Sequence, residues 1–232
     1  MQMAITKKAT SREFLFRFYK ENIVFISLFL VFFAWQLYQA LHPMWDQIVY
    51  SLQGKWFCGQ PIYFEYLRPP FPGALNCLFG AGDLAPILSA ALACVVFGYA
   101  VWLLGKKYVS AGVNPFVFFG LMFIFPMALF PSNGGWDIFA LALGLLALTL
   151  ENPFQKGFLF GLSTLTRYNY WLFLPAMLFS MDKKKWPAFF SIALLMWVPW
   201  LVYNYFQSGD ALFSVKESIL LNSDISNQPK GH

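Results

Sequence analysis

Long apolar runs, separated by short polar or proline- and glycine-rich segments, dominate the chain. The runs at 22–41, 84–104 and 187–206 have about 20 residues each, enough for a helix to cross the roughly 30 Å hydrocarbon layer of a membrane. Two shorter runs, at 115–131 and 136–150, are also almost free of charge. This pattern predicts an all-α protein that crosses a membrane several times.

The composition supports a membrane as the main solvent. Apolar residues make up 59% of the chain, aromatic residues 21% and charged residues 12%. Soluble domains average roughly 45–50% apolar and about 25% charged residues. We therefore interpret the net charge of +5 as a signal of membrane topology, and we expect membrane lipids rather than nucleic acid as partners.

Lysine and arginine gather in segments that we place on the cytoplasmic side, following the positive-inside rule. They precede the first apolar run and recur at 106–107 and 183–185. A long polar and aromatic loop, 42–83, is then exterior, and the tail is expected to be loosely ordered. The chain divides into three parts, which are a cytoplasmic amino terminus at 1–21, a membrane domain at 22–206 and an exterior tail at 207–232.

Arg167 interrupts the apolar run from Phe158 to Phe179. A guanidinium at membrane depth is costly unless it faces a partner or a water-filled cavity. One straight helix would also move the lysines at 183–185 to the exterior, against the positive-inside rule. We therefore predict a hairpin, and thus about seven membrane segments, with its polar turn buried or facing water. Its parts are a rising helix at 158–166, a turn at Arg167-Tyr168-Asn169 and a returning helix at 170–179.

Asp46 lies immediately beyond the first apolar run, next to the aromatic Trp45. A carboxylate at the water boundary can take a proton from an attacking hydroxyl, which typically contributes about 10²–10⁴-fold to a rate. Asp is also a favoured N-cap for a short interfacial helix running to Leu52. The residues alone leave both roles open.

Arg68 stands in a proline-rich part of the same loop, directly before Pro69 and Pro70. Proline restricts the backbone, so the side chain can be presented without a helix or a sheet. A guanidinium suits a phosphate because it donates two parallel, charge-assisted hydrogen bonds. The alternative is an interfacial arginine that meets lipid headgroups.

Other exterior positions also have alternatives. Asp137, in the first turn of the fourth apolar run, is either a second acid pointing into the cavity or a residue that complements the helix dipole. Cys58 and Cys77 share the first exterior loop and could form a disulfide in an oxidising compartment, but sequence does not establish the pairing.

Several motifs occur in an order that resembles a known family. They are a Trp-Asp pair beyond the first run, a Tyr-rich stretch ending in Arg-Pro-Pro, the Gly-Leu-Ser-Thr-Leu-Thr-Arg-Tyr-Asn hairpin at 161–169, and the Pro-Trp…Asn-Tyr…Gly-Asp segment at 199–210. Together they resemble the GT-C class of integral membrane glycosyltransferases. The nearest likeness is to the branch of protein mannosyltransferases and aminoarabinose transferases.

The resemblance implies transfer of a sugar from a polyprenyl-phosphate donor to an acceptor on the outer membrane face. The catalytic carboxylate then falls on Asp46, and the basic residues near the donor phosphate are Arg68 and Arg167. A divalent cation, Mg²⁺ or Mn²⁺, would have Asp46 and Asp137 as its candidate ligands, although Gln47 stands where many relatives have a second acid. Supporting or sugar-binding roles fall on Asp137, Tyr63, Glu65, Tyr168 and Asn169.

Relatives in that class usually continue with further spanning helices, whereas this sequence ends soon after the shared core. We therefore expect a minimal transferase, one half of a two-subunit membrane enzyme, or a degenerate copy retained for binding. A noncatalytic membrane subunit that stabilises a larger enzyme is a further alternative. A lipid-binding or transport scaffold is the alternative from another class, because broken helices with polar turns also form transporter binding sites. The small size and short loops favour a prokaryotic plasma membrane.

Overall fold

The fold is built from helices. The computed structural model describes residues 11–42, 45–62, 67–129 and 135–227, and all regular secondary structure in these ranges is helical. This confirms the predicted all-α class. Three helices are long and apolar enough to cross a membrane, which indicates a membrane protein, and they are Asn22–Leu41, Ala85–Ser110 and Lys183–Ser208.

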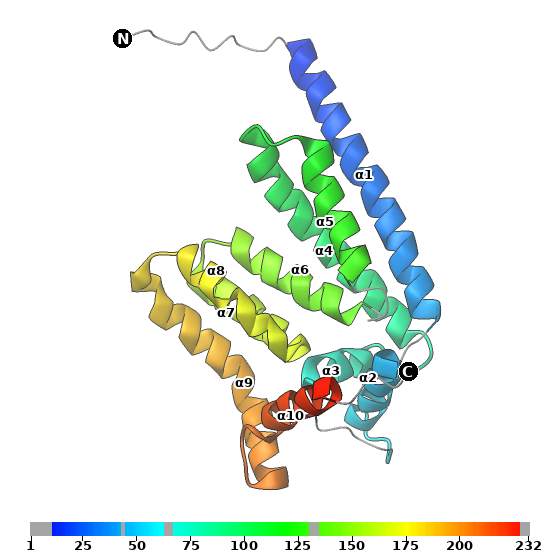
Figure 1. Cartoon of the computed structure of the whole chain (residues 1–232), viewed down its shortest axis with the longest axis vertical. Coiled ribbons are helices and arrows are strands. Elements are labelled where there is room, and N and C mark those ends of the chain that lie inside the picture. Colours follow the sequence, from blue (N-terminus) through cyan, green and yellow to red (C-terminus); the bar gives the residue numbers. More distant parts are fainter. Residues whose placement is uncertain (1–10, 43–44, 63–66, 130–134, 228–232) are drawn as a thin grey trace.

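One group of helices consists of α1 (Ser11–Leu41), α4 (Ala85–Ser110) and α5 (Pro115–Leu129). They pack together along one side of the molecule (Figure 1). Their shared core is rich in aromatic rings, and Phe32 and Phe97 are fully buried within it. α1 begins well before the first predicted apolar run, because the basic segment that precedes this run continues the same helix.

A second group consists of α6 (Trp136–Thr149), α7 (Pro153–Thr166) and α9 (Trp186–Ser208). α6 packs against both α4 and α7, so it joins the two groups. α7 and α9 approach closely where α7 carries glycine. A Cβ at Gly157, for example, would lie 2.4 Å from the backbone oxygen of Phe189.

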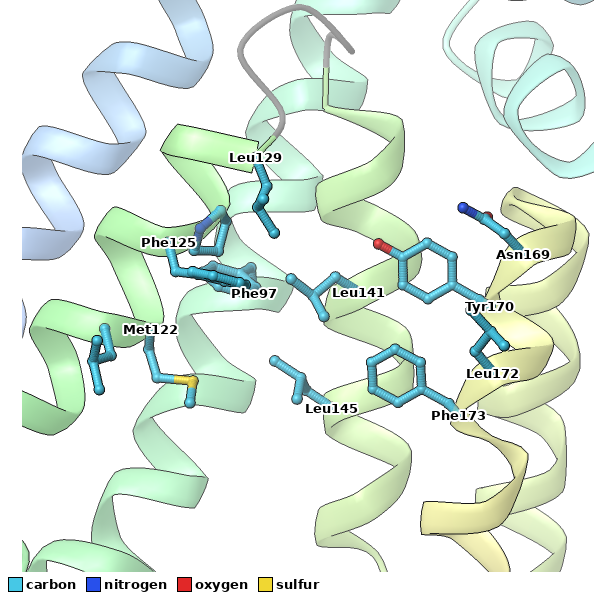
Figure 2. Close-up of a pocket in the computed structure, with 12 residues that line it drawn as sticks. Phe97, Met122, Phe125, Leu129, Leu141, Leu145, Asn169, Tyr170, Leu172 and Phe173 are labelled. Atoms are coloured by element: carbon cyan, nitrogen blue, oxygen red, sulfur yellow. The ribbon is translucent and has the colours of Figure 1, made fainter. Parts of the chain in front are cut away.

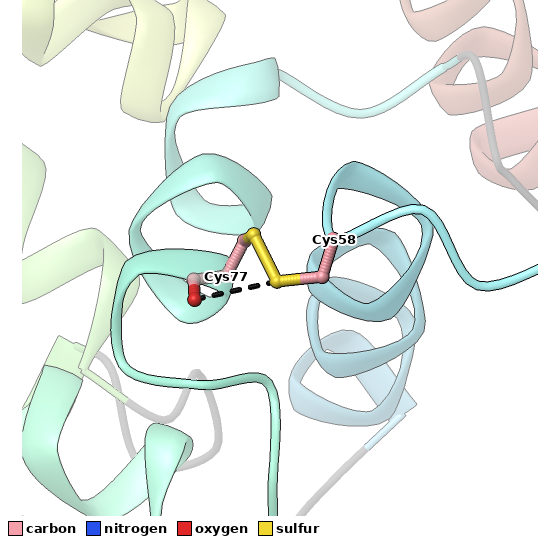
Figure 3. The surroundings of a disulfide bond; sticks show 2 residues. All are labelled: Cys58 and Cys77. Atoms are coloured by element: carbon pink, nitrogen blue, oxygen red, sulfur yellow. Dashed lines mark hydrogen bonds between the residues drawn. A yellow bond between two sulfur atoms is a disulfide. The ribbon is translucent and has the colours of Figure 1, made fainter.

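The segment predicted as a long loop contains two helices, α2 (Trp45–Phe57) and α3 (Pro70–Leu78). We call them the α2–α3 lobe, and Figure 1 shows them at one end of the bundle. A disulfide joins Cys58 and Cys77, whose Cα atoms are 5.4 Å apart (Figure 3). The prolines that favoured a loop instead start a helix, since proline is well suited to the first helical turn.

The predicted break at Arg167 is present. α7 ends at Thr166, Arg167 is extended with φ −150° and ψ 120°, and a 3₁₀ turn, η1 (Tyr168–Phe173), leads into α8 (Leu174–Phe179). The chain doubles back, so that the beginning of α7 lies next to the end of α8. Lys156, near the beginning of α7, donates a hydrogen bond of 2.6 Å to the hydroxyl of Ser180, just after α8.

α7 begins earlier than the predicted start at 158. Asn152 caps it, accepting hydrogen bonds from the backbone of Phe154 and Gln155, and Pro153 occupies the first helical position. The basic residue Lys156 consequently lies inside the helix rather than in the preceding loop. Another short 3₁₀ turn, η2 (Lys183–Lys185), leads from the hairpin into α9.

The tail is more ordered than the sequence predicted. α9 ends at Ser208 and is followed by Gly209, which adopts a positive φ of 76°, and then by α10 (Phe213–Asn227). The buried hydroxyl of Ser214 donates a hydrogen bond of 2.7 Å to the side-chain oxygen of Asn204. This buried contact ties α10 to α9, so the prediction of a loosely ordered tail was wrong for this helix.

Candidate functional site

Four charged residues from separate parts of the sequence meet in one place. One terminal nitrogen of Arg167, Nη2, donates to Asp46 Oδ2 at 2.9 Å and to Asp137 Oδ2 at 2.8 Å. Arg68 Nη2 lies 2.8 Å from the other oxygen of Asp46, Oδ1. We call Asp46, Arg68, Asp137 and Arg167 the charged cluster. The sequence proposed all four residues as site candidates, and the fold brings them together.

Helix ends position the two acids. Asp46 lies in the first turn of α2 and Asp137 in the first turn of α6, where the positive end of the helix dipole favours a carboxylate. Gly135 precedes α6 with φ +91°, and a Cβ there would lie 3.3 Å from the Cα of Ala90. This glycine therefore permits the tight turn that starts α6. Asp137 thus has the position that complements the helix dipole, and its role as a second acid of the site stays a prediction.

The two arginines are carried by non-helical backbone segments. Arg167 occupies the extended residue between α7 and η1, and Arg68 lies just before α3. Neither guanidinium is carried by a regular helical turn. The disulfide also helps to position Arg68. It links the end of α2 to the end of α3 and thereby closes the loop that contains this residue.

The charged cluster is largely withdrawn from solvent. The exposed fractions of the side chains are 6% for Asp137, 12% for Arg167, 20% for Asp46 and 21% for Arg68. Charges at such depth need partners, because desolvation otherwise makes them costly. Pairing with two carboxylates meets the requirement that the sequence raised for Arg167.

Tyr50 also belongs to this site, although the sequence analysis did not select it. Its ring is fully buried, and the guanidinium carbons of Arg167 and Arg68 lie 5.6 Å and 6.0 Å from the ring centre. Tyr50 stands four residues after Asp46, which places both on one face of α2. The four-residue spacing between Asp46 and Tyr50 was the one sequence signal for Tyr50. A chain so rich in aromatic residues has many such spacings, so this signal is weak.

The other predicted residues are placed differently. Tyr168 accepts a hydrogen bond of 2.9 Å from Trp200 Nε1, and its ring packs against Trp197. Asn169 is exposed and lines a neighbouring cavity. Tyr63 and Glu65, which the sequence also proposed, lie outside the described residues.

An apolar cavity of about 560 Å³ lies between α4, α5, α6 and η1. Figure 2 shows Asn169, Tyr170 and Phe173 on one side and Phe97 and Phe125 on the other. The Tyr170 hydroxyl donates a hydrogen bond of 2.8 Å to the backbone oxygen of Asp137. A cavity lined mainly by hydrocarbon and aromatic side chains therefore adjoins the charged cluster, and Tyr170 connects the two.

The two acids do not form a metal site in this arrangement. Asp46 and Asp137 direct their Oδ2 atoms at the same nitrogen of Arg167, so a cation stands between them already. In the part of the chain that the structure describes, no group of three or more His, Cys, Asp or Glu side chains could hold a metal ion. Mg²⁺ and Mn²⁺ therefore do not fit the two acids as they are paired with Arg167.

Comparisons with models of protein families, with curated proteins and with solved structures found no match to this chain.

Proposed function

We propose that this protein is a membrane glycosyltransferase of the GT-C type, which moves a sugar from a polyprenyl-phosphate donor to an acceptor on the outer membrane face. The observation that carries the proposal is that the charged cluster, with its two arginines, lies beside an apolar cavity, to which Tyr170 connects it through the backbone of Asp137. A lipid phosphate has the same two parts, an anion and a hydrocarbon chain. The acids of the charged cluster supply the base that the reaction requires.

Arg68 and Arg167 are assigned to the donor phosphate. In the free protein Arg167 uses one terminal nitrogen for both acids, and a guanidinium carries five donor hydrogens. It therefore has donors left for a phosphate oxygen. The apolar cavity beside η1 is assigned to the first isoprene units of the donor, with Tyr170 at the boundary between chain and headgroup.

The reaction is a substitution at the anomeric carbon. The acceptor oxygen forms a bond to this carbon, the bond between the carbon and the phosphate oxygen breaks, and polyprenyl phosphate leaves with the bonding electrons. The acceptor proton passes to Asp46. Arg68 and Arg167 stabilise the negative charge that develops on the phosphate, an effect that is strong in a site shielded from water.

The proposed topology has about seven membrane segments, with the hairpin of α7 and α8 counted as two. The α2–α3 lobe is exterior, in keeping with the Cys58–Cys77 disulfide, because disulfides persist in oxidising compartments. The lysines at 106–107 and 183–185 are then cytoplasmic. A prokaryotic plasma membrane, with the amino terminus inside and the carboxyl terminus outside, completes this proposal.

The test is release of polyprenyl phosphate by the purified protein in lipid nanodiscs, supplied with a panel of polyprenyl-phosphate hexoses as donors and a membrane extract as the source of acceptors. The variant Asp46→Asn keeps the size of the side chain but removes the base, and we expect a loss of about 10²–10⁴-fold in rate. Asp210→Asn is a matched control, because Asp210 pairs with Lys216 in an exposed position after α9. Donor binding without release by the wild-type protein would instead favour a noncatalytic subunit or a lipid-binding scaffold.

A further inference from the structure

The Tyr50 hydroxyl is a buried hydrogen-bond donor without an acceptor in the described part of the chain. Among the described residues it has no hydrogen-bond partner, and solvent does not reach it. Buried polar groups in folded proteins are nearly always paired, so each exception calls for an explanation. Here the ring that carries the hydroxyl lies beside both guanidiniums of the charged cluster, so Tyr50 is part of the surroundings of the candidate site.

Arg167, whose guanidinium lies beside the Tyr50 ring, also has a buried donor without a hydrogen-bond partner among the residues that the structure describes. Arg167 Nε is buried and has no hydrogen-bond partner within the described ranges, although Nη2 of the same group bonds two carboxylates. Two neighbouring side chains therefore each have one donor group, the O–H of Tyr50 and the Nε–H of Arg167, without a hydrogen-bond partner in these ranges. What both groups lack is an acceptor, and an anion with several oxygens would supply it.

We propose that Tyr50 is a further anion-binding residue, whose hydroxyl donates a hydrogen bond to an oxygen of the donor phosphate beside Arg167. This inference rests on the proposed function and adds a neutral donor to its two arginines. A phosphate oxygen can accept from a phenol and a guanidinium together, which would satisfy both unpaired groups at once.

The protonation state of Tyr50 agrees with a donor role. Burial raises the pKa of its phenol above the ordinary value of 10.0, and this effect outweighs the opposing influence of Arg167 and Arg68. The hydroxyl therefore keeps its proton near neutral pH. Because Tyr50 lies one helical turn after Asp46, the same face of α2 presents a donor for the phosphate and the base for the acceptor.

The experiment measures the affinity of undecaprenyl phosphate, which lacks a sugar, for the protein in nanodiscs. Tyr50→Phe removes one oxygen but keeps the ring beside the guanidiniums, and we expect binding to weaken by roughly ten- to a hundredfold. Tyr203→Phe is the matched control, since Tyr203 is another phenol with a buried hydroxyl and its ring stacks on Trp200. It should bind as the wild type does.

Stability separates a binding role from a structural one. Tyr50→Phe removes an unpaired buried group, so its thermal midpoint should equal or exceed that of the wild type while its affinity falls. Tyr50→Leu, which also removes the ring, should bind more weakly still. If Tyr50→Phe binds as well as the wild type and only Tyr50→Leu is impaired, the ring alone matters and the proposal for the hydroxyl is wrong.

Different results would reject the transferase function and the role of Tyr50. Wild-type protein that binds undecaprenyl phosphate, together with an unaffected Tyr50→Phe variant, would reject the role of Tyr50 and leave the transferase intact. Wild-type protein that binds no undecaprenyl phosphate would reject the proposed donor class, and the inference on Tyr50 with it.

Discussion

Two cations at opposite ends of the α7–α8 hairpin are both withdrawn from water but have different partners. Arg167, at the turn, bonds two carboxylates. Lys156, near the beginning of α7, is 1% exposed, and within the described part of the chain its hydrogen-bond partner is the neutral hydroxyl of Ser180. One cation is thus neutralised by acids, whereas the other only closes the hairpin.

The difference separates a site from a structural contact. Arg167 belongs to the charged cluster, and its Nε has no hydrogen-bond partner among the described residues. Under the proposed function this donor serves the anion of the lipid. Lys156 has no acid partner among the described residues, so its ammonium group is buried at a net cost. Substituting each cation by methionine should therefore change stability in opposite directions.

Arg167→Met should produce the largest effect. It leaves Asp137, with a side chain 6% exposed, as a buried charge without its guanidinium, and breaking such a pair typically costs about 3–5 kcal/mol. Thermal unfolding in detergent would measure this loss. The double variant Arg167→Met with Asp137→Asn should recover part of it, and equal losses in the single and double variants would contradict the pairing.

Loss of the Cys58–Cys77 disulfide should come next. The bond closes a loop with a sequence separation of 19 residues, for which the expected stabilisation is about 3 kcal/mol. Hydrogen exchange should show the α2–α3 lobe opening, while the amides around Lys156 stay protected. Reductant should have no further effect on the Cys58→Ala, Cys77→Ala double variant, and uniform loosening of both regions would contradict a local role.

Lys156→Met should act in the opposite sense. Replacing a buried ammonium with an apolar chain of similar length should stabilise the protein by about 1–2 kcal/mol. The measurement is the thermal midpoint in detergent, with Lys216→Met as the control because Lys216 is 58% exposed. A lower midpoint for Lys156→Met would mean that the ammonium is required for the hairpin and would remove the contrast with Arg167.

Asn152→Ala should have the smallest effect, a loss of about 1 kcal/mol, because Asn152 caps α7 through its side-chain oxygen. Asn152→Asp keeps an acceptor at the same place and should remain close to the wild type. Thermal unfolding of the two variants would check this. If both lose the same stability, the amide nitrogen rather than the cap oxygen is responsible.

Much of the candidate site could be predicted from the sequence. A guanidinium within an apolar run restricts the possible structures so strongly that both the break at Arg167 and its need for partners follow from it. Asp46 and Asp137 could be proposed as site residues because each lies beside an apolar run, and Arg68 because it stands before a pair of prolines. Their ion pairs with one another came from the structure. Their roles in sugar transfer stay predictions.

Other parts had weaker signals. Tyr50 was missed because one ring among many aromatics is distinguished only by its surroundings in the fold. The sequence analysis predicted a loop where the α2–α3 lobe lies. In sequence, a proline in the first turn of a short helix looks the same as a proline that breaks a helix. The early start of α7 depends on the cap at Asn152, which affects only a few residues and hardly alters the apolar pattern.

The covalent bond between Cys58 and Cys77 also has a practical consequence for making this protein. The two cysteines flank Arg68 in sequence, so a host that does not oxidise these thiols will produce chains in which the loop that carries Arg68 lacks its covalent closure. Recombinant protein intended for assays should therefore be checked for free thiols by alkylation and mass spectrometry before any lack of turnover is interpreted.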